Sequence, residues 1–169
     1  MRFTETMEDK RGYVSSRLKT PSLLECHTQG LDNHVEVSRM GLNERRKIKE
    51  LQETTLPGRV KEIEEICGQG IPYEVDWDSL ADDAEALNFL DNISCHRLNM
   101  ALRTICIDDM GKEAVRDGLK LIKLKNVKDK SDMSMTFDGG VLDMHCAYGL
   151  RTEGMFSDGQ IREMLLTKL

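Results

Sequence analysis

The feature that most constrains the fold is an alternating apolar segment, residues 133–148, interrupted by the turn signal Asp138-Gly139. Such a pattern is typical of a β-hairpin with a two-residue loop. That loop would pair Phe137 with Gly140, Met135 with Leu142 and Met133 with Met144. A three-residue loop would shift the register by one and set apolar residues opposite polar ones, so we predict the two-residue loop. One face would then carry Met133, Met135, Phe137, Leu142, Met144, Cys146 and Tyr148.

Two further segments have the period of a strand. In residues 71–77 the apolar side chains Ile71, Tyr73, Val75 and Trp77 alternate with polar ones. Residues 119–127 form a second predicted strand, in which Lys123 and Lys125 alternate. The acidic residues Glu74, Asp76 and Asp78 resemble a magnesium or calcium site only weakly, because no closing ligand loop follows. We therefore expect them to pair with the two lysines in the sheet.

The remaining periodic segments predict helices. A capping-box spacing at residues 82–85 opens a long helix to about Ile107, and its apolar residues cover most of the circumference. A helix that apolar is expected to be central. Pro57 is expected to open a helix that ends at Gly68, and a short helix should follow Asp108. Residues 157–160 should cap a C-terminal helix.

These elements predict an α+β fold. We expect about four strands in a largely antiparallel sheet, with the helices packed on one face and one long central helix. Residues 1–40 show no sustained period, apart from a possible short strand at residues 34–37, and are predicted to be an N-terminal arm or partly ordered extension. Residues 41–169 are predicted to form a single α+β domain.

Charge and cysteine content limit the class of protein. The chain has 24 Lys and Arg against 30 Asp and Glu, a net charge of −6, which argues against nucleic-acid binding. No stretch approaches the roughly 20 apolar residues of a membrane span, and the N-terminus lacks the apolar segment of a secretory signal. Five cysteines without a C-x-x-C motif favour reduced thiols over a disulfide framework. We therefore expect a cytoplasmic protein.

One polar stripe is the main candidate site. Asn92, His96, Asn99 and Arg103 fall on one side of the long predicted helix, bordered by Asn88, Asp91 and Cys95. Polar groups that converge in an apolar setting are typical of ligand pockets, and Arg103 could hold a carboxylate or phosphate. With Asp91 as its partner, His96 could act as an acid or base. The alternatives are a buried polar network that satisfies itself, or an exposed helix edge.

Other chemistry-bearing residues give weaker signals. Three Cys–His neighbours, at positions 26–27, 95–96 and 145–146, use zinc-ligand types, but adjacent residues point in different directions. His145 would face Asp132 across the hairpin, with Ser134 nearby, yet no nucleophile motif is present. The glycine spacings match no phosphate-binding loop. We therefore expect no metal, no cofactor and no catalytic residue.

A helix at residues 42–54 carries only a narrow apolar stripe, Ile48 and Leu51. Such a stripe resembles a coiled-coil seam and needs a partner, either the chain's own sheet or a second copy. A symmetric homodimer through helix 42–54 or the sheet face is the default expectation. The three methionines 133, 135 and 144 could also form an adaptable apolar groove, although core packing explains them as well.

The segments 57–67, 75–77 and 108–114 together resemble small bacterial proteins of unknown function, of the kind found in environmental genomes and integron gene cassettes. The resemblance spans residues 56–148 and includes no catalytic motif. It implies a bacterial, possibly mobile origin and no particular activity. The sequence thus favours a non-enzymatic ligand-binding or protein-interaction module. The alternative is a small enzyme or sensor for an anionic molecule at the polar stripe.

Overall fold

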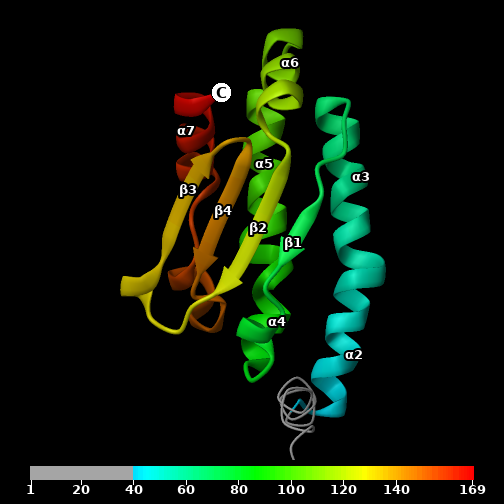
Figure 1. The fold of residues 1–169 in the computed structure, drawn as a ribbon, viewed down its shortest axis with the longest axis vertical. Coiled ribbons are helices and arrows are strands. Elements are labelled where there is room, and N and C mark those ends of the chain that lie inside the picture. The colour runs from blue at the N-terminus through cyan, green and yellow to red at the C-terminus, as the bar shows by residue number, and fades with distance from the viewer. Residues whose placement is uncertain (1–39) are drawn as a thin grey trace, which may run out of the picture.

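The computed structural model describes residues 40–169, so the predicted arm and the possible strand at residues 34–37 lie outside the described residues, Met40 excepted. The α-helices are α2 (Leu42–Glu50), α3 (Leu56–Cys67), α4 (Ala84–Leu90), α5 (His96–Ile105), α6 (Asp109–Gly118) and α7 (Asp158–Lys168). The strands are β1 (Tyr73–Val75), β2 (Leu121–Asn126), β3 (Ser134–Asp138) and β4 (Val141–Cys146). The α+β class with four strands is therefore as predicted (Figure 1).

The prediction of a largely antiparallel sheet is wrong. The strand order is β1-β2-β4-β3, with β1–β2 and β2–β4 parallel and only β3–β4 antiparallel. The chain leaves β2, passes beyond the place of β4 to form β3, and then returns through the hairpin to fill the gap. Alternation shows which face a strand buries but not its direction, so the hairpin alone suggested antiparallel neighbours.

The hairpin has the predicted two-residue loop, but its register differs. Phe137 pairs with Leu142 and Met135 with Met144, so the loop is formed by Gly139 and Gly140 rather than by Asp138 and Gly139. Both glycines have positive φ, 55° and 83°, as the favoured hairpin turn requires at both central positions. A turn centred on Asp138 would force an L-residue into that conformation. The shift is two residues, so the apolar face is preserved.

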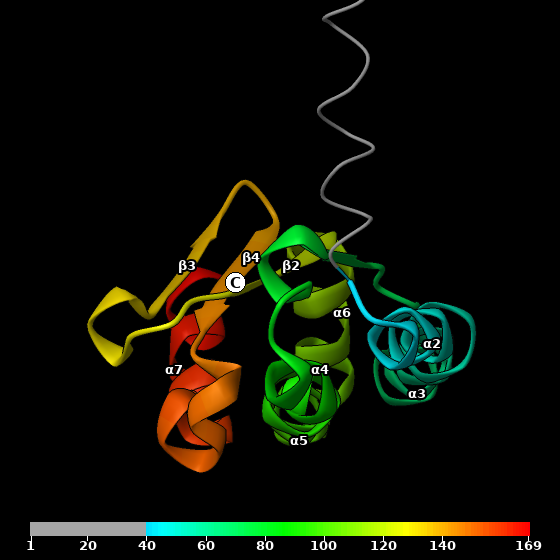
Figure 2. The same cartoon turned by 90° about the horizontal axis from the view of Figure 1, so that it is seen from below.

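The sheet has one apolar and one polar face. Ile122, Leu124, Leu142 and Met144 are fully buried against the helices, which lie on one side of the sheet (Figure 2). The opposite face carries the predicted ion pairs. Lys123 Nζ lies 3.0 Å from Glu74 Oε1, and Lys125 Nζ lies 3.6 Å from Asp76 Oδ2. Glu74 in β1 and Asp76 directly after it therefore have the predicted lysine partners, whereas Asp78 has no lysine partner within residues 40–169.

Two long helical segments each contain a π-helical turn. The expected long central helix is α4 and α5 joined by the π-helical residues Asp91–Cys95, so it is not one uninterrupted α-helix. The π-helical residues Leu51–Thr55 likewise join α2 to α3. Pro57 therefore lies near the start of α3 but inside a continuous helical segment. Proline has no N–H to donate to the preceding turn, and the wider π-helical turn accommodates the loss of that hydrogen bond. Gly68, with φ 81°, ends α3 as predicted.

The narrow stripe of helix 42–54 packs inside the molecule. Leu51 is only 1% exposed and belongs to the core, and Ile48 packs against the same cluster. The chain itself covers this stripe, but α2 packs against α4 rather than against the sheet that we expected as the internal partner. None of the helices in residues 40–169 is both long and apolar enough to cross a membrane.

Candidate functional site

The structure places part of the predicted polar stripe against α3. Asp91, Cys95, Asn99 and Arg103 follow one another at intervals of four residues, and Cys95 and Asn99 are buried. In an α-helix such a series drifts by about 40° per step, but the wider π-helical turn reduces the drift. The series consequently stays on the side that contacts α3. Asn92 is exposed and His96 half-buried, and neither forms a side-chain hydrogen bond within residues 40–169.

The network is centred on two residues of α3 that the sequence reading did not single out. Arg59 donates from Nε and Nη2 to the two carboxylate oxygens of Asp91, at 2.8 and 2.9 Å. Its Nη1 donates to Glu62 at 2.8 Å. This planar, two-point contact is the strongest form of carboxylate pairing that an arginine makes. The hydrogen bonds to Asp91 raise the pKa of Arg59 above its ordinary value.

Glu62 accepts three hydrogen bonds. Its Oε1 accepts from Arg103 at 2.6 Å, and its Oε2 accepts from Arg59 and from Asn99, each at 2.8 Å. Burial on its own would raise the pKa of Glu62, but these hydrogen bonds outweigh burial and lower the pKa to about 2. Glu62 is therefore ionised at neutral pH and forms ion pairs with both Arg59 and Arg103.

The network is electrically balanced. Two arginines face two carboxylates, and Asn99 completes its bonding by accepting from Tyr73 at 3.4 Å. Burial raises the pKa values of Tyr73 and Cys95, so both side chains stay neutral. This geometry supports the alternative of a network that satisfies itself, because Arg103 already holds a carboxylate. Binding of an anion by Asn92, His96, Asn99, Arg103 and Asp91 stays a prediction.

A groove that the sequence did not reveal lies beside this network, between α3 and β1. It has a volume of about 460 Å³. Its walls are mainly apolar: Leu56, Pro57 and Val60 on the helical side, and Tyr73, Val75 and Trp77 on the strand side. The alternation at residues 71–77 predicted the strand wall correctly. The opposite wall could not be predicted, because sequence does not show which helix runs beside which strand.

The strand side of this groove is also a sheet edge. Among the described strands β1 is the outermost, and its bonds to β2 use even-numbered residues, with Pro72 accepting from Ile122 at 3.1 Å and Asp76 donating to Leu124 at 2.9 Å. Backbone groups alternate in direction along a strand, so the N–H and C=O of Tyr73 and Val75 point away from β2. Within residues 40–169 they have no hydrogen-bond partner. α3 runs alongside this edge (Figure 1).

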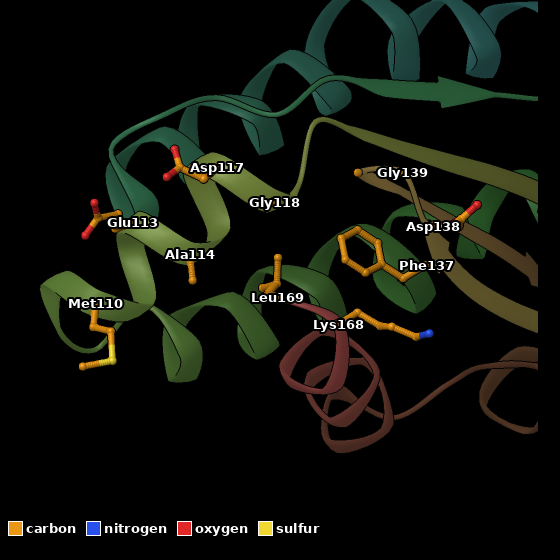
Figure 3. A pocket seen from close by; sticks show the side chains of 11 residues that line it. Met110, Glu113, Ala114, Asp117, Gly118, Phe137, Asp138, Gly139, Lys168 and Leu169 are labelled. Atoms are coloured by element: carbon orange, nitrogen blue, oxygen red, sulfur yellow. The ribbon is translucent and has the colours of Figure 1, made fainter.

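Two other grooves are more polar. One, about 590 Å³, lies between α6, the β3–β4 turn and the end of α7, and exposed carboxylates of Glu113, Asp117 and Asp138 line it (Figure 3). The other, about 550 Å³, is lined by Asp78, Asp82, Asp83, Glu85 and Lys128, among others. Among the described residues no three His, Cys, Asp or Glu side chains group as a metal site would require.

The predicted opposition of His145 and Asp132 is wrong, because the hairpin register differs. Ser134 stands opposite His145 on the neighbouring strand. His145 Nε2 instead lies 3.3 Å from Asp143 Oδ1, its neighbour on the same face of β4. This surface contact runs along β4, so it is not the cross-strand pair that the expected register would have given.

Comparisons with protein-family models, with curated proteins and with solved structures found no match for this chain. The resemblance to small bacterial proteins therefore stays a prediction. The groove between α3 and β1 is the best-supported candidate site, because it combines an apolar cavity with unpaired backbone groups.

Proposed function

We propose that this chain is a non-enzymatic protein-interaction module that binds an extended peptide segment of a partner protein along the free edge of β1. The main support is that the N–H and C=O groups of Tyr73 and Val75, which point away from β2, lie beside the apolar groove between α3 and β1. A peptide added to a sheet edge gains affinity from backbone hydrogen bonds and specificity from pockets for alternate side chains. This arrangement supplies both.

The chemistry of the occupant follows from the walls. A peptide strand paired with β1 would direct every second side chain toward Leu56, Pro57 and Val60. Those positions would be apolar, because none of the described residues that line this groove is charged. The groove lies along the edge of a single strand, so an extended segment is favoured over a second globular surface.

We also propose that the chain forms a homodimer and is located in the cytoplasm. Leu51 is part of the core, so a dimer would use a surface other than the Ile48–Leu51 stripe. The other surface that the sequence suggests for a dimer is the polar sheet face, where Glu74 and Lys123 pair across two strands. The four described cysteines are free and buried, which supports a reducing compartment.

The proposal is tested by selecting displayed random linear peptides on the full chain and measuring the affinity of the winners. Val75→Pro removes one edge N–H without touching the bonds to β2, and Val60→Asp places a charge in the helical wall. Each should weaken binding about tenfold or more, an effect of roughly 1.4 kcal/mol. Lys123→Ala, on the opposite face of the sheet, is the matched control and should bind as the parent does.

Three outcomes contradict the proposal. No peptide is enriched, or the enriched peptides bind Val75→Pro and Val60→Asp as tightly as the parent. The third is a native mass spectrum in which the parent is a dimer and both variants are monomers, which would assign the groove to a second copy of the chain.

A further inference from the structure

Cys67 and Cys106 bring two sulfur atoms together in a region that the proposed function does not use. Their Sγ atoms lie 2.8 Å apart, although the residues are 39 positions apart in the chain. A disulfide bond is about 2.05 Å long, so the sulfurs need to approach by only about 0.8 Å. Cys67 is the last residue of α3 and Cys106 follows the last residue of α5. The two helix ends hold the thiols in place.

We propose that Cys67 and Cys106 form a redox modification site that takes two oxidising equivalents from a small hydroperoxide and closes a reversible disulfide between α3 and α5. The site favours a small oxidant because access is narrow. Cys106 is 5% exposed and Cys67 is fully buried. Hydrogen peroxide fits such access, whereas a bulky disulfide such as oxidised glutathione does not.

The two cysteines have different roles. The hydrogen bond from the Cys67 thiol lowers the pKa of Cys106, and the cations Lys112 and Arg116 act in the same direction. The same hydrogen bond raises the pKa of Cys67, so Cys67 keeps its proton. The thiolate is the nucleophile in cysteine oxidation. Cys106, which is also the more accessible of the two, is therefore the residue that meets the oxidant.

The reaction balances with one peroxide. The Cys106 thiolate attacks one peroxide oxygen, the O–O bond breaks, and hydroxide leaves and takes up the proton that Cys106 had lost, giving water and Cys106 sulfenic acid. The Cys67 sulfur then attacks the sulfenic sulfur, the S–S bond forms, and the hydroxyl leaves with the Cys67 proton as a second water. Two thiols and one hydrogen peroxide thus give one disulfide and two waters.

The test uses the full chain with Cys26→Ser, which removes the cysteine outside the described residues. After hydrogen peroxide treatment, mass spectrometry of a non-reducing digest should find a peptide pair linked through Cys67 and Cys106. The intact mass should fall by two hydrogen atoms, and a reducing agent should reverse the change. The thermal midpoint should rise by on the order of 10 °C, because the bond closes a long loop.

Single variants assign the roles. With Cys67→Ala, Cys106 should accumulate as sulfenic acid and react with dimedone, whereas with Cys106→Ala, Cys67 should stay a thiol. Glutathione in a parallel tube, treated with the same peroxide, reports that the peroxide is active. The proposal is overturned if glutathione is oxidised while Cys106 remains a thiol. It is also overturned if Cys106 of the parent oxidises beyond sulfenic acid with no link to Cys67.

Discussion

Arg59 and Asp91, 32 positions apart in the sequence, form a two-point ion pair with donor–acceptor distances of 2.8 and 2.9 Å. The pair joins α3 to the π-helical turn between α4 and α5. Both side chains are only about a quarter exposed, at 24% and 27%. Removal of one partner from a partly buried pair is destabilising, because the remaining charge loses a group that compensated for its burial.

Asp91→Asn should lower the free energy of unfolding by about 1–3 kcal/mol, since the guanidinium of Arg59 would lose the two-point contact with Asp91 and keep only Glu62 as a carboxylate partner. Urea unfolding measures this directly. Glu85→Gln is the matched control. It breaks the exposed contact of Glu85 with Arg151, at 2.6 Å, and should cost less than about 1 kcal/mol. Equal losses in the two variants would contradict the central role given to Arg59 and Asp91.

Glu62 should make stability depend on acid pH. Its pKa is lowered from 4.5 to about 2 in the folded chain, so its contribution is complete above pH 5. The contribution is lost as pH falls from about 5 toward 2, where the folded state must also take up the proton. Partial solvent exposure reduces the effect to about 1–2 kcal/mol. Unfolding titrations between pH 2 and 7 follow it.

Glu62→Gln should lose stability at pH 7 and flatten this acid dependence. Glu65→Gln, an exposed position on the same helix, removes the same charge without an ion pair in the described structure and serves as control. If both variants keep the parent's slope between pH 5 and 2, other carboxyl groups cause the acid dependence and the assignment to Glu62 is wrong.

Gly154 should tolerate no side chain. A Cβ at this position would lie 1.8 Å from the carbonyl oxygen of Ala147 and 2.6 Å from its carbonyl carbon, and both are backbone atoms. Gly154→Ala should therefore cost about 3 kcal/mol or more. A Cβ at Gly58, within α3, meets nothing within 4 Å, so Gly58→Ala should stabilise the chain by about 0.5–1 kcal/mol. Thermal unfolding of the two variants should shift in opposite directions.

The sequence predicted faces better than directions. Alternation at residues 71–77 identified the buried side of β1, and the lysines of β2 pointed to the ion pairs Glu74–Lys123 and Asp76–Lys125. These inferences rest on local periodicity, which side chains obey wherever the strand lies. Strand direction and order depend on how the connecting segments cross the sheet. The residues of β2 and β4 carry no signal that distinguishes a parallel from an antiparallel neighbour.

The candidate site was predicted only in part, for a related reason. Asn99, Arg103 and Asp91 were recognised as unusual polar residues, but their partners Arg59 and Glu62 look like ordinary surface residues in the sequence. A π-helical turn also has no distinct sequence signal, so the stripe was placed through Asn92 and His96 rather than through Cys95. The groove beside β1 requires knowledge of tertiary neighbours and was missed.

The hairpin loop offers a direct test of register. Gly139 has φ 55° and open space around a would-be Cβ, so Gly139→Asn should be neutral or stabilise by up to about 0.5 kcal/mol, because asparagine tolerates this conformation. Gly140 has φ 83°, and its Cβ would lie 3.0 Å from the Gly118 carbonyl oxygen. Gly140→Ala should therefore cost about 1–2 kcal/mol. In the register first predicted, Gly140 would instead pair within the strand and accept alanine readily. Urea unfolding of the two variants distinguishes the registers, since an unaffected Gly140→Ala would favour the loop at Asp138 and Gly139.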